Sequence, residues 1–293
     1  MATTISGYTP GCIDSSNGTK LLLDQESIDR AYREEDGHVT RSTAHSVFKH
    51  GGLGQEMLDN GERLFPGNQG TDFGTLVDRG VPALVCGVDW ESLYVSPPDE
   101  VLSNGARRGK AYTEWKESIG SAMEISRSDA WKLSKIMANV MANPAARAII
   151  EATEDCQATF RHTDAAGHKR KALADGVTPD FLWDFKTTSS NWSQLYRSCI
   201  DYGYLWQAAW YVDAAVACGW PDHQLKFVFA QSTPPFAVRV YTLPDELVQR
   251  ARLEIAVTLD QMALRRELGV YRSAEDEEEM ELEFPSWMTG GKK

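Results

Sequence analysis

The clearest helical spacing of hydrophobic residues lies within 129–151, and a strand-like spacing follows it up to about residue 188. Residues 129–151 place apolar side chains three and four positions apart, which predicts a helix with one buried stripe. Ser126 and Asp129 have the spacing of a capping box at its start, and Pro144 should kink or split the helix. Shorter helical segments are predicted within 40–51, 69–81 and 104–120.

Strand patterns follow this helix. Residues 156–177 are predicted to form two strands joined by a turn at 163–167. Residues 181–188, "FLWDFKTT", are rich in β-forming side chains and predict a third strand.

The remainder of the chain alternates between the two patterns. Residues 189–219 are predicted to be helical, with Ser189 or Ser190 as N-cap and a break at Gly203. A hairpin at 224–243 and a last helix at 244–267 follow. The order of elements predicts an α/β (α+β) fold, in which helices flank a mixed central β-sheet.

Composition divides the chain into three parts. Residues 1–40 are polar and turn-rich and predict an N-terminal arm, residues 41–270 one domain, and residues 271–293 an acidic C-terminal tail. Seven acidic residues within 274–283 account for much of the net charge of −12, and without them the charge is −5. This balance argues against binding to nucleic acid through overall charge, although a local basic groove remains compatible with it.

Targeting and redox signals are weak. No stretch is long and apolar enough to predict a membrane span, and the N-terminus does not resemble a secretory signal. The five cysteines are scattered and never form a C-x-x-C pair, which argues against a disulfide framework or a zinc ribbon. A cytoplasmic protein with reduced cysteines is expected.

The candidate chemistry lies in residues 174–190. Asp184 and Lys186 are two apart in a predicted strand, so they share one face of the sheet. A surface ion pair is the simplest explanation of such a pair. Asp175, however, ends the preceding strand, and two carboxylates at the same end of adjacent strands beside a lysine suit Mg²⁺. A metal bound there would lower the pKa of a water molecule for phosphodiester hydrolysis. Asp180 is too close to Asp184 to lie on a neighbouring strand, and is predicted to belong to the turn.

The motif D-x8-D-F-K-T-T, followed by a helix with Y-L-W-Q-A-A-W-Y, resembles the PD-(D/E)xK nuclease superfamily. Within it, the chain is most similar to exonuclease VIII (RecE-type) domains, and more distantly to lambda exonuclease. The resemblance extends over roughly residues 40–270 and implies a restriction-endonuclease-like core.

The resemblance implies a set of site residues. It makes Asp175 and Asp184 metal ligands and Lys186 the catalytic lysine, with the backbone carbonyl of Phe185 completing the metal shell. The family's glutamate corresponds best to Glu154, with Asp155 and Glu151 as alternatives. Asp78 stands where many relatives have a metal-binding histidine, and an aspartate there favours Mg²⁺ over softer metals.

Several residues are expected to bind DNA. Gln207 and Tyr211 resemble the family's Q-x-x-x-Y motif and share a helix face. Thr187 and Thr188 precede a helix whose N-terminus suits a phosphate. Two basic clusters could hold further phosphates, namely Lys169, Arg170 and Lys171, and Arg107, Arg108 and Lys110. Alternatively, the Q-x-x-x-Y pair could occupy ordinary positions of an amphipathic helix, and the basic clusters could be a solvated surface.

The resemblance implies a Mg²⁺-dependent DNA exonuclease, with Mn²⁺ able to substitute, that degrades one strand from a double-stranded end for recombination. Such relatives work with a single-strand annealing protein and often form homo-oligomeric rings, in phage or bacteria. No Walker A motif is present, so a ring would have to supply processivity. The alternatives are an endonuclease or single-strand nuclease of the same fold, and a non-catalytic DNA-binding or assembly protein.

Overall fold

The computed structural model describes residues 7–9, 32, 37–62, 72–120, 122–220, 224–273, 276 and 279. The chain divides into two compact units. The first comprises Met1–Arg41 and Gly67–Leu253, and the second Ser42–Pro66 and Glu254–Lys293. Most of the predicted N-terminal arm and acidic tail lies outside the described residues, and the predicted domain limits remain predictions.

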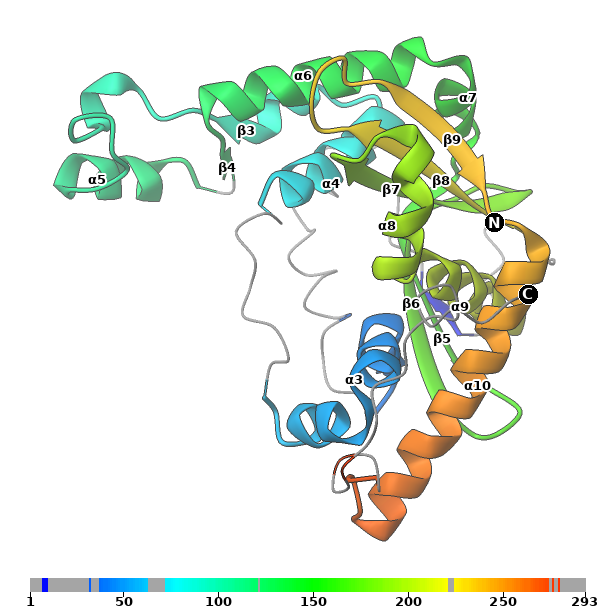
Figure 1. Ribbon diagram of the computed structural model, residues 1–293. Helices are drawn as coiled ribbons and strands as arrows, with labels where there is room; N and C mark the ends of the chain where they lie inside the picture. The colour runs from blue at the N-terminus through cyan, green and yellow to red at the C-terminus, as the bar shows by residue number, and fades with distance from the viewer. Residues whose placement is uncertain are drawn as a thin grey trace, which may run out of the picture. The chain divides into compact units, whose positions relative to one another are not determined.

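A mixed sheet forms the centre of the first unit (Figure 1). Its strands lie in the order β1 (Tyr8–Thr9), β5 (Asp155–Thr163), β6 (Lys169–Val177), β7 (Phe181–Thr188), β8 (Gln224–Gln231) and β9 (Val238–Thr242). A short strand, β2 (Val39–Thr40), pairs in parallel with β6. Strands β7 and β8 are also parallel, whereas the remaining pairs along the path are antiparallel. The predicted mixed sheet with flanking helices is therefore confirmed.

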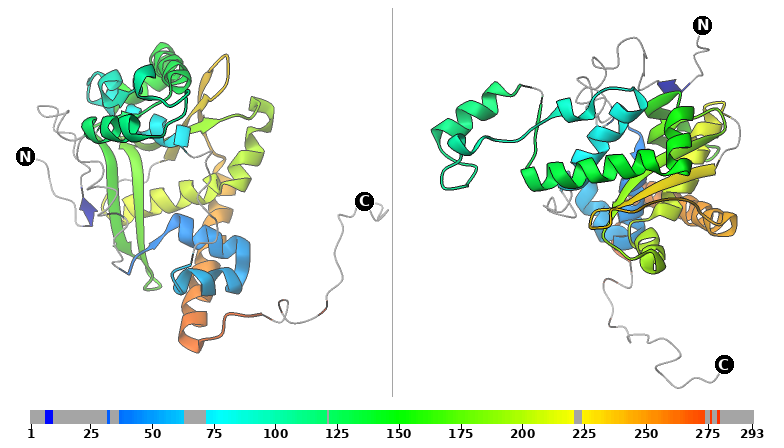
Figure 2. Two further views of the ribbon diagram at one scale, coloured as in Figure 1. Left: turned by 90° about the vertical axis from the view of Figure 1, so that its left-hand side faces the viewer. Right: turned by 90° about the horizontal axis from the view of Figure 1, so that it is seen from above.

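The β5–β6 hairpin is the longest antiparallel pair and is visible as two adjacent green strands in Figure 2. Its register runs from Asp155 opposite Val177 to Thr163 opposite Lys169. At its turn the Asp164 carboxylate accepts hydrogen bonds from the amides of Ala166 and His168. The turn predicted at 163–167 is confirmed.

One face of the sheet is covered by α4 (Asp72–Val85), α6 (Arg127–Ala142) and α7 (Pro144–Ala152). Their apolar side chains pack with Trp183 and Phe185 in one core. The predicted helix at 129–151 is split, because Pro144 starts α7 and the Asn143 side chain caps it. Ser126 caps α6 by accepting from the Asp129 amide, as predicted.

The opposite face is covered by α9 (Tyr204–Ala217), which contacts β5, β6 and β8. A 3-10 turn η4 (Trp192–Gln194) and α8 (Leu195–Asp201) precede it. Gly203 breaks the helix as predicted, with a left-handed backbone at φ 67° that favours glycine. The predicted N-cap at Ser189 or Ser190 is wrong, since η4 begins after Asn191. The path β7–α8–α9–β8 supplies the crossover that parallel strands require.

An extension leaves the core between α4 and α6. It contains η2 (Trp90–Leu93), β3 (Tyr94–Val95), η3 (Asp99–Val101), α5 (Lys110–Ser118) and β4 (Met123–Glu124). Figure 1 shows α5 projecting away from the sheet, and no residue of α5 is buried. Glu124 holds the extension together instead, by pairing with Arg107 at 3.1 Å and Lys116 at 3.0 Å. Arg107 in the second predicted basic cluster therefore has an acidic partner.

The second unit is mainly helical. It contains α3 (Arg41–Asp59) from Ser42 onward and α10 (Asp245–Leu268) from Glu254 onward. Buried Gln55 donates to the Met262 carbonyl at 2.8 Å, and Asp59 pairs with Arg266. No helix among the described residues is long and apolar enough to cross a membrane.

Candidate active site

The site begins where strands β6 and β7 separate. Their ladder contains only two pairs, Gly176 with Trp183 and Val177 with Leu182. Thr178 builds the turn between them, because its hydroxyl accepts from the Phe181 amide at 2.9 Å and donates to the Phe181 carbonyl at 2.8 Å. Beyond Gly176 the strands part and form a fork.

Trp183 and Gly176 explain why the two strands approach so closely at this point. A Cβ atom on residue 176 would lie 2.1 Å from Trp183 Nε1, so only glycine fits beneath the indole. The indole N–H donates to Thr153 Oγ1 at 2.9 Å, which fixes the ring. The turn and the buried ring together set the position of the next residue, Asp175.

Asp175 binds the main chain of β7 through its side chain. Its Oδ2 accepts from the Phe185 amide at 2.8 Å, and its Oδ1 accepts from Gln157 Nε2 at 3.2 Å. By the register of the ladder, Asp175 would lie opposite Asp184. The fork therefore brings the two carboxylates together without a main-chain pair between them.

Asp184 and Lys186 lie on the sheet face that α9 covers. Asp184 is 2% exposed and forms an ion pair with the ammonium group of Lys186. The side-chain amide of Gln207 on α9 donates to the other Asp184 oxygen. We call Asp175, Asp184 and Lys186 the fork cluster.

The charges of the fork cluster do not balance. Burial raises the pKa of Asp175 well above its usual range, and the nearby charges of Asp184 and Asp78 act in the same direction. Burial alone would lower the pKa of Lys186, but the carboxylates of Asp184 and Asp175 outweigh it and raise that pKa. With both acids ionised the cluster has an excess of negative charge, which either a proton on Asp175 or a bound cation would neutralise.

The donor set fits a hard divalent cation. Asp175 and Asp184 offer carboxylate oxygens, and the Phe185 carbonyl faces the same strand edge as the amide that Asp175 binds. Mg²⁺ usually retains several waters and takes only one or two protein carboxylates. Within the part of the chain that the structure describes, no group of three or more His, Cys, Asp or Glu side chains gathers at one metal position.

The predicted third acidic ligand is not brought into the fork cluster. Glu154 and Glu151 are exposed, and Glu151 lies 3.8 Å from Arg147. Asp155 is buried at the start of β5. Asp78 lies exposed on α4, near enough to influence the pKa of Asp175. A metal-binding role for any of these four acids remains a prediction.

The Q-x-x-x-Y pair lies against the fork cluster. Gln207 is 1% exposed, and its Oε1 is a buried atom without a hydrogen-bond partner in the described structure. Tyr211, one turn later, is also buried, and burial and the Asp184 charge raise its pKa well above the usual range. Both residues therefore lie beneath the carboxylates instead of at an open surface.

Most of the remaining residues predicted to contact DNA on β6 and β7 are buried or half-buried. The Thr188 hydroxyl accepts from the Ser190 amide at 3.1 Å, whereas Thr187 is half-buried. Lys169 is exposed, but Arg170 and Lys171 are only 5% and 3% exposed. A phosphate-binding role for these two buried cations is not supported.

Arg170 belongs to a second group of charges. Its guanidinium stacks on Trp210 at 4.2 Å and lies 3.8 Å from Asp164 and 3.9 Å from Asp213. Arg252 also pairs with Asp213, at 2.7 Å. We call Asp164, Arg170, Asp213 and Arg252 the arginine cluster.

Three residues near the fork cluster were missed from the sequence. Gln157 lies across from Asp175, a position that follows from the predicted turn at 163–167 once the strands are counted back from it. Tyr204 lies one turn before Gln207, and Lys186 Nζ is 5.7 Å from its ring centroid. Arg41 donates to the Tyr202 carbonyl at 3.1 Å, and no local pattern indicated this long-range contact.

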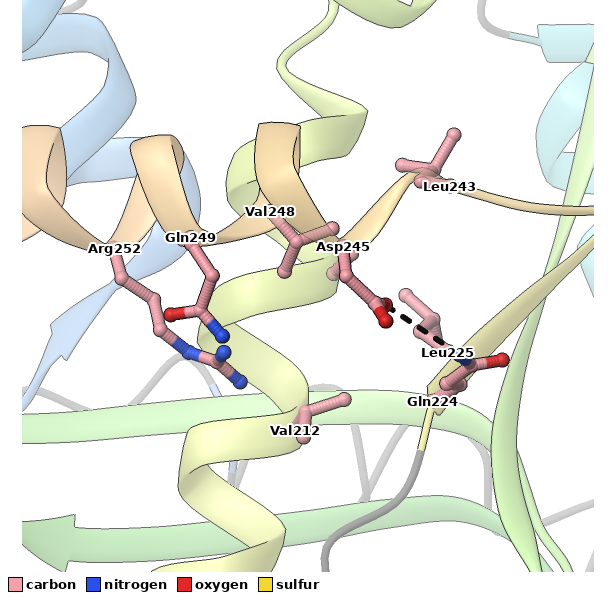
Figure 3. A pocket seen from close by; sticks show the side chains of 9 residues that line it. Val212, Gln224, Leu225, Leu243, Asp245, Val248, Gln249 and Arg252 are labelled. Carbon is pink, nitrogen blue, oxygen red and sulfur yellow. Dashed lines mark hydrogen bonds between the residues drawn. The ribbon is translucent and has the colours of Figure 1, made fainter.

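A cavity of about 310 Å³ lies away from these residues, between α9, β8 and the first turns of α10 (Figure 3). Its lining consists of Ala208, Val212, Gln224, Leu225, Leu243, Asp245, Val248, Gln249 and Arg252. It contains no member of the fork cluster and no predicted DNA-binding residue.

Comparison with solved structures identifies the fold. A candidate exonuclease from Eubacterium rectale superposes with a TM-score of 0.52 over 96% of this chain and 99% of its own, at 15% sequence identity. The two chains share one fold. A weaker match is an alkaline exonuclease from Laribacter hongkongensis, with a TM-score of 0.27 and 16% identity, covering 62% of this chain and 94% of its own. The structure of that enzyme in complex with dAMP matches with a TM-score of 0.26 and 16% identity, covering 55% of this chain and 87% of its own. No protein-family profile and no curated protein sequence matches the chain. The shared fold agrees with the mixed sheet and flanking helices expected from the sequence.

Proposed function

We propose that the protein is a metal-dependent DNA exonuclease of the exonuclease VIII (RecE-type) kind. The observation that carries the proposal is the fork cluster, in which two carboxylates and a lysine meet where two strands separate. The fold shared with a candidate exonuclease supports the same conclusion.

Each residue of the fork cluster has a role in this proposal. Asp175 and Asp184 would hold Mg²⁺, or Mn²⁺ in its place, with the Phe185 carbonyl. When bound, the metal would supply a water of lowered pKa and neutralise charge on the phosphoryl group. Lys186 would orient the attacking water, because its ammonium group already lies against Asp184. Gln207 would keep the Asp184 carboxylate in place through its amide.

The biological context of the proposal comes from the resemblance. The enzyme would act in the cytoplasm of a bacterium or of a phage-infected host, and resect double-stranded ends to leave single strands for recombination. It would work beside a single-strand annealing protein, and a ring of several copies would supply processivity.

The test compares linear and closed circular DNA in the presence of Mg²⁺. The wild-type protein should release nucleotides from linear duplex and leave circles intact, and a chelator should abolish release. Lys186→Ala should reduce release by at least about 10³-fold, because the group that orients the water is lost. Equal release by wild type and Lys186→Ala would contradict the proposal.

Two outcomes would favour the alternatives. Cleavage of closed circles would indicate an endonuclease with the same site. Failure to bind metal would indicate a non-catalytic protein with the same fold. Titration calorimetry with Mn²⁺ separates that possibility, since a non-catalytic site should bind no metal and release no nucleotides from DNA.

A further inference from the structure

A run of aromatic rings connects the solvent with the catalytic lysine. Tyr202, just after α8, is 63% exposed, and its ring centroid lies 5.9 Å from that of Tyr204. Tyr204 is only 7% exposed, and Lys186 Nζ lies 5.7 Å from its ring. An exposed ring therefore lies one aromatic contact away from the fork cluster.

The inner ring of this run is fixed from several sides. Tyr204 packs against Phe227 and Phe229 of β8, with centroid separations of 5.5 and 5.7 Å. Burial raises the pKa of Tyr204 to about 12, so its hydroxyl stays neutral and serves as packing. The Tyr204 ring is therefore fixed in position where it packs against Tyr202.

The main chain that carries the outer ring is also held in place, although the ring itself is exposed. The Tyr202 amide closes the end of α8 by donating to the Ser198 and Ile200 carbonyls. The Tyr202 carbonyl accepts from Arg41 at 3.1 Å. The next residue, Gly203, has the left-handed backbone that turns the chain into α9. An exposed tyrosine on a fixed main chain is suited to a flat ligand, because a tyrosine side chain loses little conformational entropy on contact.

We propose that Tyr202 stacks on an unpaired base of the strand whose phosphate lies at the fork cluster; the inference rests on the proposed nuclease function. Every nucleobase has an apolar face and a polar edge, which match the ring and hydroxyl of a tyrosine. Inside a duplex both faces of a base are covered by its neighbours. Tyr202 would therefore select a terminal or single-stranded nucleotide over one within intact duplex.

The experiment measures how tightly the protein binds a short DNA duplex with a single-stranded tail. A chelator is present, so the wild-type protein cannot cleave the DNA. A fluorescent 2-aminopurine base at successive tail positions reports stacking through quenching. Wild type and Tyr202→Phe should quench it, whereas Tyr202→Ala should not. Tyr202→Ala should also bind the tailed DNA roughly 5- to 150-fold more weakly. Replacing the tail nucleotides by abasic ones should remove this difference between variants.

Tyr196→Ala is the matched control. Tyr196 is a similarly exposed tyrosine of α8, at 56%. Its hydroxyl accepts a hydrogen bond from Arg197, and its ring is not part of the Tyr202–Tyr204 run. It should bind like wild type. Equal losses for Tyr196→Ala and Tyr202→Ala, or a Tyr202→Ala loss that persists on abasic DNA, would overturn the inference.

Cleavage of linear DNA with Mg²⁺ tests the nuclease function separately from the stacking role of Tyr202. If wild type cleaves and Tyr202→Ala binds tailed DNA normally, the stacking role falls and the nuclease function stands. If wild type neither binds nor cleaves DNA, both fall.

Discussion

The fork cluster and the arginine cluster are two groups of charges that both contact α9, yet they are built differently. The fork cluster has two carboxylates and one ammonium group, and α9 contributes the neutral side chain of Gln207. The arginine cluster has two carboxylates and two guanidinium groups, and α9 contributes the charge of Asp213 and the ring of Trp210.

The difference lies in charge balance and not in burial. Arg170 and Asp184 are similarly buried, at 5% and 2% exposed. In the arginine cluster two guanidinium groups face two carboxylates, so the formal charges cancel, although Arg170 Nε and Nη2 have no hydrogen-bond partner among the described residues. The fork cluster has one more carboxylate than it has ammonium groups, and burial together with the second carboxylate raises the pKa of Asp175. A buried charged group thus points to chemistry when its charges do not cancel.

The largest expected effect contrasts two aspartates of one hairpin. Asp175→Asn should lower nuclease activity by at least about 10³-fold, because it removes a metal-binding carboxylate. Asp180→Asn is the same chemical change at an exposed turn position, and should retain most activity. Rates of nucleotide release from linear DNA with Mg²⁺ check both variants. The reverse order of activities would place the chemistry at Asp180.

The second effect concerns folding through the arginine cluster. Arg170→Met should lower the free energy of unfolding by about 2–4 kcal/mol, because it removes the buried cation that faces both Asp164 and Asp213. Denaturant unfolding measures the loss, and Lys169→Met, at an exposed neighbouring position, is the control. The folded Arg170→Met protein should keep its rate of cleavage. A loss of activity without a loss of stability would show that this cluster also takes part in the reaction.

A third, smaller effect exposes the imbalance of the fork cluster. The folded-state pKa of Asp175 is raised, so the stability linked to this group is present at low pH and is lost as the pH rises through that pKa. Without metal, Asp175→Asn should therefore become more stable than wild type as the pH increases, by about 1 kcal/mol or about 2–4 °C in Tm.

Thermal melts in a chelator at several pH values measure this gap. Asp180→Asn should follow wild type. Mg²⁺ should stabilise wild type but not Asp175→Asn. If the two melting curves keep a constant separation at all pH values, the carboxyl of Asp175 is not the source of the imbalance.

The smallest effect lies at the edge of the arginine cluster. Burial lowers the pKa of His162 to about 4, and the facing charge of Arg170 adds to this, against the opposite influence of Asp164 and Asp213. His162 therefore contributes stability above its usual pKa, and this is lost as the pH falls from about 6.5 toward about 4. His162→Gln should flatten the dependence of Tm on pH in this window. An unchanged slope would assign the acid sensitivity to other groups.

Much of the fold followed from local patterns. The Pro144 split, the Gly203 break and the turn at 163–167 depend on short-range rules of capping, backbone freedom and alternation. The start of the helix after β7 was missed because the Thr188 side chain forms a turn with Ser190 before η4 begins.

The site was less accessible from the sequence. Spacing along β6 and β7 placed Asp175, Asp184 and Lys186 together, since residues two apart share a strand face. The burial of Arg170 could not be foreseen, because α9 covers a face that an isolated hairpin would leave to solvent. The contact between Arg41 and Tyr202 joins residues 161 positions apart, and local patterns carry no information at that range.

The short turn at Thr178 determines how strands β6 and β7 are aligned at the fork cluster. Most surface loops tolerate insertions, and their length drifts freely between related chains. Here the turn determines which residue of β6 meets the Phe185 amide, and a slip of one residue would point Asp175 to the opposite face of the sheet. The length of this three-residue turn therefore sets which side chains meet in the fork cluster, so an insertion should disrupt the cluster where Asp180→Asn would not.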